Sequence, residues 1–254
     1  VTEGRSSSSQ EAGGRPRRDA LRERWKARVP RWYSPVFHLT SNLVVVGAAV
    51  ALLIVEIARY GVRPVAWLAI PATFMLANVL EYILHRYPMH RRNPLLERMF
   101  KRHTLQHHRY FTQTSMAIGS KRDLFFIMFP VQYGLVSILL ASVVYLGLRA
   151  FMSPGAAALA GITLIVYFLF IDLIHLVFHL PLRWFRRVPI LRGKIVRYLR
   201  WHHLVHHDPR LMNSWNFNIT LPITDWIVGT TYRGTFEVRE TDPEPELVPD
   251  PQKG

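Results

Sequence analysis

Four long apolar segments alternate with polar regions along the chain. The apolar segments cover residues 36–59, 64–84, 124–148 and 156–180, and each contains few charged residues. A stretch of about 20 mainly apolar residues is long enough to cross a bilayer as a helix. Buried helices of a large soluble protein are the alternative, but the chain has too little polar surface to cover four such helices. The pattern therefore predicts an all-α integral membrane protein with about four transmembrane helices.

The distribution of basic residues predicts how these spans are oriented. Lys and Arg number nine in residues 1–35, nine in 85–123 and eleven after residue 181, whereas the links at 60–63 and 149–155 hold one each. Four spans return the chain to the side on which it started, so the three basic regions lie on one side. The positive-inside rule makes that side cytoplasmic.

The net charge of +15 has to be interpreted together with these spans. In a soluble protein it would indicate nucleic acid or an acidic partner. Basic residues beside membrane spans usually meet anionic lipid instead. We therefore expect contact with membrane lipid and no nucleic-acid partner.

The two ends of the chain differ from its apolar middle. Residues 1–30 are basic and rich in Ser and Gly, and residues 236–254 are acidic and rich in Pro, so we expect two disordered tails around a membrane domain at 31–235. No cleavable signal peptide is visible ahead of the first span. Val1 is consistent with a start codon translated literally. We expect a multi-pass protein of a bacterial cytoplasmic membrane, with both termini in the cytoplasm.

Histidines are concentrated next to the second and fourth spans. Eleven of the twelve lie in residues 85–108 and 175–207. Both windows begin at the predicted cytoplasmic ends of spans, so they can converge over one membrane face. The chain has no cysteine, so any metal must be held by nitrogen or oxygen. Neutral imidazole is a good ligand for iron, zinc and copper.

The spacing of these histidines indicates which of them could share a metal. Residues three or four apart lie on one face of an α-helix, so such a pair could aim two nitrogens at one ion. The candidate pairs are His103 with His107, His175 with His179, and His203 with His206.

Two adjacent doublets extend the pattern to a second ion. The members of 107–108 and of 206–207 point about 100° apart on a helix, so each doublet could serve two metals. His85 and His90 flank Pro88, where we expect the chain to leave regular helix. Ten imidazoles exceed the needs of one ion. We therefore predict a di-metal site held by His85, His90, His103, His107, His108, His175, His179, His203, His206 and His207.

We expect different roles for the other two histidines. His202 could be a ligand or merely a neighbour of the better-spaced His203, and the sequence does not decide. We expect the isolated His38 to be solvated or hydrogen-bonded. Histidine with arginine could also bind lipid phosphates, but phosphate recognition prefers Arg and Lys and does not explain the repeated spacings.

Carboxylates near the histidines are candidates for supporting roles. Glu81 lies four residues before His85, and Asp172 lies three before His175. We expect these two carboxylates to orient an imidazole through the ring N–H that faces away from the metal. Asp225 and Asn218 could brace the site or order a turn, and the sequence does not decide between these two roles.

The order of these motifs resembles that of the fatty acid hydroxylase / sterol desaturase superfamily of integral-membrane di-metal oxygenases. The family pattern is H-x4-H, H-x2–3-HH, H-x3-H and H-x2–3-HH, and the ten predicted ligands match it in order. The stretch NSWNFNITLPITDWIVGT at 213–230 is similar to the family's closing segment. The resemblance covers about residues 65–232.

The resemblance implies a cytosolic helical cap that carries two iron ions, for which zinc could substitute. It implies that O2 is a co-substrate and that a lipid C–H bond is oxidised to an alcohol or, with loss of a second hydrogen, to a double bond. The 254 residues leave no room for a fused electron donor. We therefore expect two electrons from a separate cytochrome b5-like or ferredoxin-like protein.

Several functions remain open at this point. A fatty acyl chain is our first substrate class, followed by sterol oxidation or desaturation, and then by a carotenoid. A non-catalytic metal- or lipid-binding membrane protein is the alternative of another class, although such a protein would be free to lose a histidine. A zinc-dependent hydrolase would call for a motif such as H-E-x-x-H, which the sequence lacks.

Overall fold

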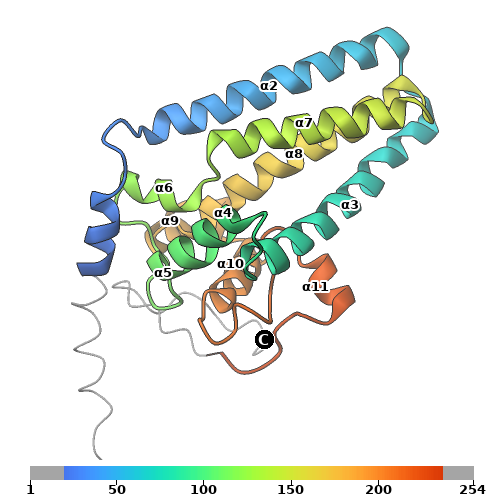
Figure 1. The fold of residues 1–254 in the computed structure, drawn as a ribbon. Coiled ribbons are helices and arrows are strands. Elements are labelled where there is room, and N and C mark those ends of the chain that lie inside the picture. Colours follow the sequence, from blue (N-terminus) through green and yellow to red (C-terminus); the bar gives the residue numbers. More distant parts are fainter. Residues whose placement is uncertain (1–19, 237–254) are drawn as a thin grey trace, which may run out of the picture.

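The computed structural model describes residues 20–236, which form a bundle of long helices with a cap of short helices at one end (Figure 1). Four helices are long and apolar enough to cross a membrane. They are α2 (Pro35–Tyr60), α3 (Ala69–Leu84) with the flanking segments η1 (Pro64–Leu68) and η2 (His85–Met89), α7 (Val131–Arg149) and α8 (Pro154–Phe178). No β-strand occurs between residues 20 and 236. The predicted all-α membrane fold is confirmed.

Helix α8 is the centre of the bundle, because α2, α3 and α7 all pack against it. Its first turns consist of small buried residues that let neighbouring helices approach closely. At Gly155, a Cβ atom would lie 2.1 Å from the carbonyl oxygen of Gly61, so only glycine fits there. The outward faces of α2 and α7 expose apolar side chains such as Leu52 and Leu139, as expected for helices that face lipid.

The third span begins later than the sequence predicts. The segment 124–148 is divided into α6 (Leu124–Ile127) and α7, because Pro130 cannot continue the helix and disfavours helical backbone before it. Two buried side chains satisfy the freed peptide groups of Phe129. Its N–H donates to Asp172 Oδ1 of α8 (3.0 Å), and its carbonyl oxygen lies 2.7 Å from His38 Nε2 of α2. Helix α6 therefore belongs to the cap.

The cap is built from the residues that connect the spans at one end of the bundle. At this end it gathers the described parts of the three basic regions, residues 20–35, 85–123 and 182–236 (Figure 1). Besides α6, its elements are α4 (Glu97–Phe100), η3 (Lys101–His107), α5 (His108–Tyr110), η4 (Lys121–Asp123), α9 (Leu182–Arg187), η5 (Pro189–Arg192), α10 (Lys194–His206) and α11 (Ile223–Val228).

The segment before the first span is packed against the cap, although the sequence predicts a disordered tail over residues 1–30. Residues 20–27 are helical, and Trp25 of this helix and Val29 just after it pack against the cap residues Phe126 and Ile127. The Arg22 side chain donates to three backbone carbonyls of residues 110–117, at 3.0, 3.0 and 3.3 Å. The remaining parts of the predicted tails, 1–19 and 237–254, lie outside the described residues.

The contacts of Arg22 predict that it stabilises the cap. Arg22→Gln should lower the free energy of unfolding by about 1–3 kcal/mol, because it leaves several buried carbonyl groups without their charged donor. Thermal unfolding of the detergent-purified protein measures this loss. Arg24→Gln removes the same charge from an exposed position and should leave the unfolding temperature unchanged. Equal unfolding temperatures for both variants would contradict the assigned role.

Candidate metal centre

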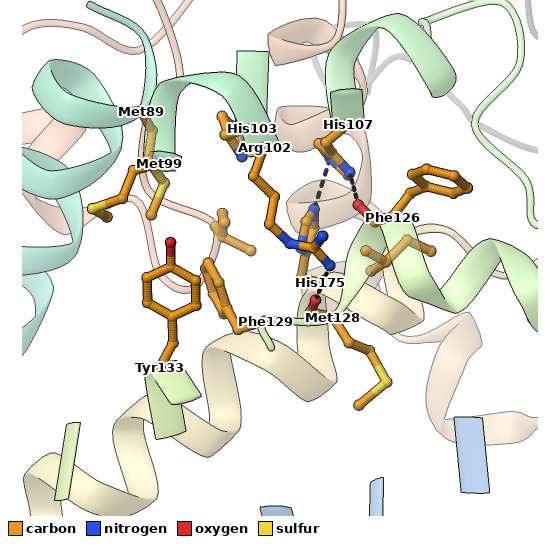
Figure 2. A pocket seen from close by; sticks show the side chains of 12 residues that line it. Met89, Met99, Arg102, His103, His107, Phe126, Met128, Phe129, Tyr133 and His175 are labelled. Atoms are coloured by element: carbon orange, nitrogen blue, oxygen red, sulfur yellow. Dashed lines mark hydrogen bonds between the residues drawn. The ribbon is translucent and has the colours of Figure 1, made fainter. Parts of the chain in front are cut away.

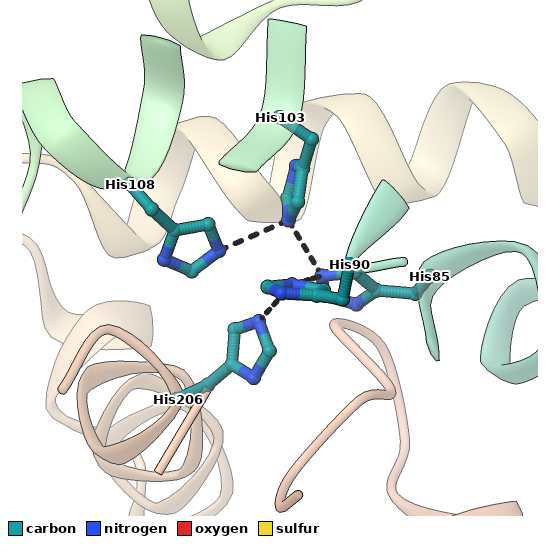
Figure 3. A group of neighbouring side chains, drawn as sticks. All are labelled: His85, His90, His103, His108 and His206. Carbon is teal, nitrogen blue, oxygen red and sulfur yellow. Dashed lines mark hydrogen bonds between the residues drawn. The ribbon is translucent and has the colours of Figure 1, made fainter. Parts of the chain in front are cut away.

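The ten predicted ligands lie in two groups of five where the bundle meets the cap. Within each group, one ring nitrogen from every histidine lies within 4.8 Å of the others, and all ten side chains are buried. The first group, shown in Figure 3, consists of His85, His90, His103, His108 and His206. The second group consists of His107, His175, His179, His203 and His207.

Each group is assembled from segments that are far apart in the sequence. The first group combines residues from η2 and its C-terminal end with residues of η3, α5 and α10. The second combines the C-terminal end of α8 with residues of η3 and of α10 and its C-terminal end. His175 and His179 share the second group, as their four-residue spacing predicts.

The predicted pair His103–His107 is divided between the two groups. These residues lie in η3, which is a π-helix with hydrogen bonds between residues five apart. Its wider turn places His103 beside His108, with their Nε2 atoms 3.0 Å apart, and directs His107 to the second group. The prediction assumed α-helical geometry and was wrong for this reason.

The predicted pair His203–His206 is also divided. In the α-helix α10, the four-residue spacing brings His203 next to His207 instead, and their Nε2 atoms are 3.0 Å apart. His206 joins the first group. Each histidine doublet therefore contributes one member to each group, as the sequence predicted, and His85 and His90 flank the non-α turn expected around Pro88.

Backbone carbonyl groups orient five of the ten rings. Because a neutral imidazole carries only one N–H, a ring that donates through Nδ1 must present a lone pair at Nε2. Four of these Nδ1···O distances are 2.8–2.9 Å. The pairs are His85 with Phe217, His107 with Phe126, His179 with Met116, His206 with Trp215, and His207 with Phe111.

The lone pairs face one another, which is the strongest structural indication of a metal. In the second group, the five Nε2 atoms form a closed ring with neighbouring distances of 3.0–3.3 Å. His107 and His207 both donate through Nδ1, yet their Nε2 atoms are 3.1 Å apart. Two lone pairs cannot form a hydrogen bond, so this geometry calls for a cation between them. The residues fit a bound metal ion.

Burial keeps these imidazoles in the form that binds metals. It lowers the pKa of His206 to about 4. Seven other histidines of the two groups have pKa values well below their usual range. Burial is the largest cause and repulsion among the rings is the second, so these rings are neutral at pH 7. These members are His90, His103, His107, His108, His179, His203 and His207.

Asp225 braces the segment that orients the first group. Its carboxylate accepts the backbone N–H groups of Phe217 (3.0 Å) and Asn218 (2.7 Å). Burial opposes its charge, but hydrogen bonds from His202, Asn218 and Thr230 hold the pKa of Asp225 below its usual value. His202 lies in neither metal group, and its Nε2 atom is 3.3 Å from Asp225 Oδ2. Of the two roles that the sequence left open for His202, the structure therefore favours that of a neighbour that supports Asp225.

Glu81 and Asp172 bind backbone N–H groups near the site instead of the ligand imidazoles that the sequence predicts. Glu81 accepts the backbone N–H groups of Ile219 (2.6 Å) and Thr220 (3.0 Å), next to the carbonyl group that holds His85. Asp172 holds the break before α7. No hydrogen bond joins either carboxylate to a ligand imidazole in residues 20–236, so the predicted orienting role was wrong. The backbone carbonyl groups fill it.

A small cavity touches both groups of histidines (Figure 2). Its volume is about 30 Å³, and His103 of the first group lines it together with His107 and His175 of the second. Such a volume holds about one water-sized molecule. The flexible thioether side chains of Met89 and Met99 lie in its wall, so a larger ligand could enter if they move.

Arg102 also lines this cavity, and the sequence analysis missed it. Its guanidinium group donates to the backbone oxygens of Phe125 and Met128, and it lies over the Phe125 ring, 4.8 Å from the centroid. Burial lowers the pKa of Arg102 below its usual value. Only its position before His103 in a basic stretch could have drawn attention to it.

Neighbouring histidines of α10 provide a matched test of the ligand groups. His203→Gln should reduce the metal content of the purified protein from about two ions per chain to about one, because the second group loses a nitrogen that faces its centre. His202→Gln keeps a donor for Asp225 and should retain both ions. Elemental analysis measures both variants, and equal metal loss in the two would contradict the grouping.

Comparison with protein families identifies the family of the chain. A model of the fatty acid hydroxylase family matches residues 70–230, the region that contains both groups of histidines. No curated protein and no solved structure matches the chain significantly. The family match covers more than half of the 254 residues and confirms the resemblance drawn from the histidine motifs. The chain belongs to the fatty acid hydroxylase family.

Proposed function

We propose that the protein is a membrane-bound di-iron oxygenase that hydroxylates a C–H bond of a lipid, with a fatty acyl chain as the first substrate class. The observation that carries the proposal is the pair of buried, neutral imidazole groups at the end of a membrane bundle. In the balanced reaction, the lipid, O2, two electrons and two protons give the lipid alcohol and water.

The donor atoms are compatible with iron as the metal. Nitrogen ligands of this kind suit iron, zinc and copper, so the same rings would also accept zinc in a purified sample. Each group offers five neutral nitrogens, and no carboxylate belongs to either group among the described residues. Bound iron would supply the activation of O2 that an unactivated C–H bond requires.

The side chains around the cavity would position the lipid and exclude water. Phe129 and Tyr133 line it where α7 begins, next to the part of the bundle that faces lipid (Figure 2). An acyl chain that enters past these rings, with Met89 and Met99 moved aside, would reach His107 and His175 through a mainly apolar wall. Water is thereby kept from the reacting carbon.

The basic cap supports the remaining parts of the proposal. Its charge favours a cytoplasmic location under the positive-inside rule, with the protein in a bacterial cytoplasmic membrane. The same charge would attract an acidic surface of a cytochrome b5-like or ferredoxin-like electron donor. Such a separate protein would deliver the two electrons.

Labelled oxygen tests the proposed reaction. Cells that express the chain, supplied with oxygen-18 gas, should accumulate a hydroxylated fatty acyl lipid with one labelled oxygen atom, detected by mass spectrometry. His206→Ala should lower its formation by at least about a hundredfold, because the first group loses a ligand.

The origin of the oxygen atom separates the alternatives. Label from water instead of O2 would indicate a hydrolase, and a new double bond without label would indicate a desaturase. Unchanged lipids in cells that contain the metal-loaded protein and a reductant would contradict the proposal and favour a non-catalytic binder.

A further inference from the structure

A second cavity lies between α2 and α7, at the end of the bundle away from the cap. Its volume is about 430 Å³, within the range of small-molecule sites. Apolar side chains form most of its wall. They include Ala49, Leu52, Leu53 and Val55 of α2 and Ile138 and Ala141 of α7.

The length of this groove matches one leaflet of a bilayer. Its lining residues on α2 run from Ala49 to Arg59. Ten residues of α-helix extend about 15 Å, which is half of the hydrocarbon thickness of about 30 Å. The groove therefore has the length of an acyl chain in the leaflet opposite the metal centre.

Charged groups lie at the outer end of the groove. Glu56, Arg59 and Arg149 line it there, a rare arrangement within membrane helices and one that marks ligands or paired charges. Glu56 Oε2 is 3.9 Å from Arg149 Nη2, a loose ion pair. This oxygen is buried and accepts no hydrogen bond from the described residues. The Tyr145 hydroxyl group also lines the groove and interacts with this carboxylate. A carboxylate has about four lone-pair sites, so it can accept a further donor.

We propose that this groove binds a phospholipid with an ethanolamine head group. One acyl chain occupies the apolar groove, the phosphate group lies between Arg59 and Arg149, and the primary ammonium group donates to Glu56. The phosphate group then has guanidinium donors on two sides, and the ammonium group has a carboxylate acceptor. The site lies at the opposite end of the bundle from the histidines, so the proposal is independent of the oxygenase function.

Lipid retention by the full chain tests the site. Native mass spectrometry after titration with phosphatidylethanolamine, phosphatidylcholine and phosphatidylglycerol of identical acyl chains should show a preference of about tenfold for the ethanolamine lipid, whose ammonium group can donate to Glu56. Arg149→Gln should weaken this binding about tenfold, and Glu56→Gln should abolish the preference over the choline lipid. Arg63→Gln removes a charge from an exposed residue outside the groove and should change nothing.

A variant without charge change keeps the test independent of the ion pair. Ala49→Phe fills the groove and should lower retention of all three lipids, while an unchanged metal content shows that the protein remains folded. Equal retention of the ethanolamine lipid by wild type and Arg149→Gln would overturn the proposal. Stronger retention of phosphatidylglycerol than of the ethanolamine lipid would overturn it as well, because Glu56 would then have no ammonium partner.

Discussion

Ten imidazoles are buried in two groups with their ring nitrogens directed at one another, and much of the structure serves to hold this unfavourable arrangement. In the second group, the Nε2 atoms form a closed ring at 3.0–3.3 Å. His107 and His207 have no hydrogen atom to share between their Nε2 atoms, because both rings donate through Nδ1. Protonation would relieve the repulsion, but burial opposes the charge. A metal ion at each centre would resolve both conflicts, because it would accept the lone pairs without protonating the rings.

The surrounding fold supplies rigid carbonyl groups at the places where the rings need acceptors. The carbonyl groups of Phe111 and Met116 hold rings of the second group, and Arg22 clamps the loop that carries them. The carbonyl groups of Trp215 and Phe217 hold rings of the first group. Asp225 fixes this segment, because its carboxylate accepts backbone N–H groups of the segment. Support of this kind, one step away from the metal ligands, commonly decides metal affinity.

The sequence predicted the parts of the structure that follow from composition and from residue spacing. The four spans, the ten clustered histidines and the division of each doublet follow from apolar length and helical geometry. The π-helix at η3 could not be predicted, because the choice between π and α geometry depends on tertiary contacts that local sequence does not reveal, and it redirected His103 and His107. The acceptors of the Nδ1–H groups are backbone atoms, which leave no residue-type signal, so the expectation fell wrongly on Glu81 and Asp172. The order of residues 20–30 depends on carbonyl groups about 90 residues away.

X-ray absorption at the iron edge, on protein reconstituted with iron under reducing conditions, tests the central claim most directly. The account predicts two iron ions per chain, each surrounded by nitrogen atoms with the multiple-scattering signature of imidazole rings. A first coordination shell dominated by oxygen, or no iron retained by correctly folded protein, would contradict it, because the converging lone pairs would then serve some purpose other than holding metal.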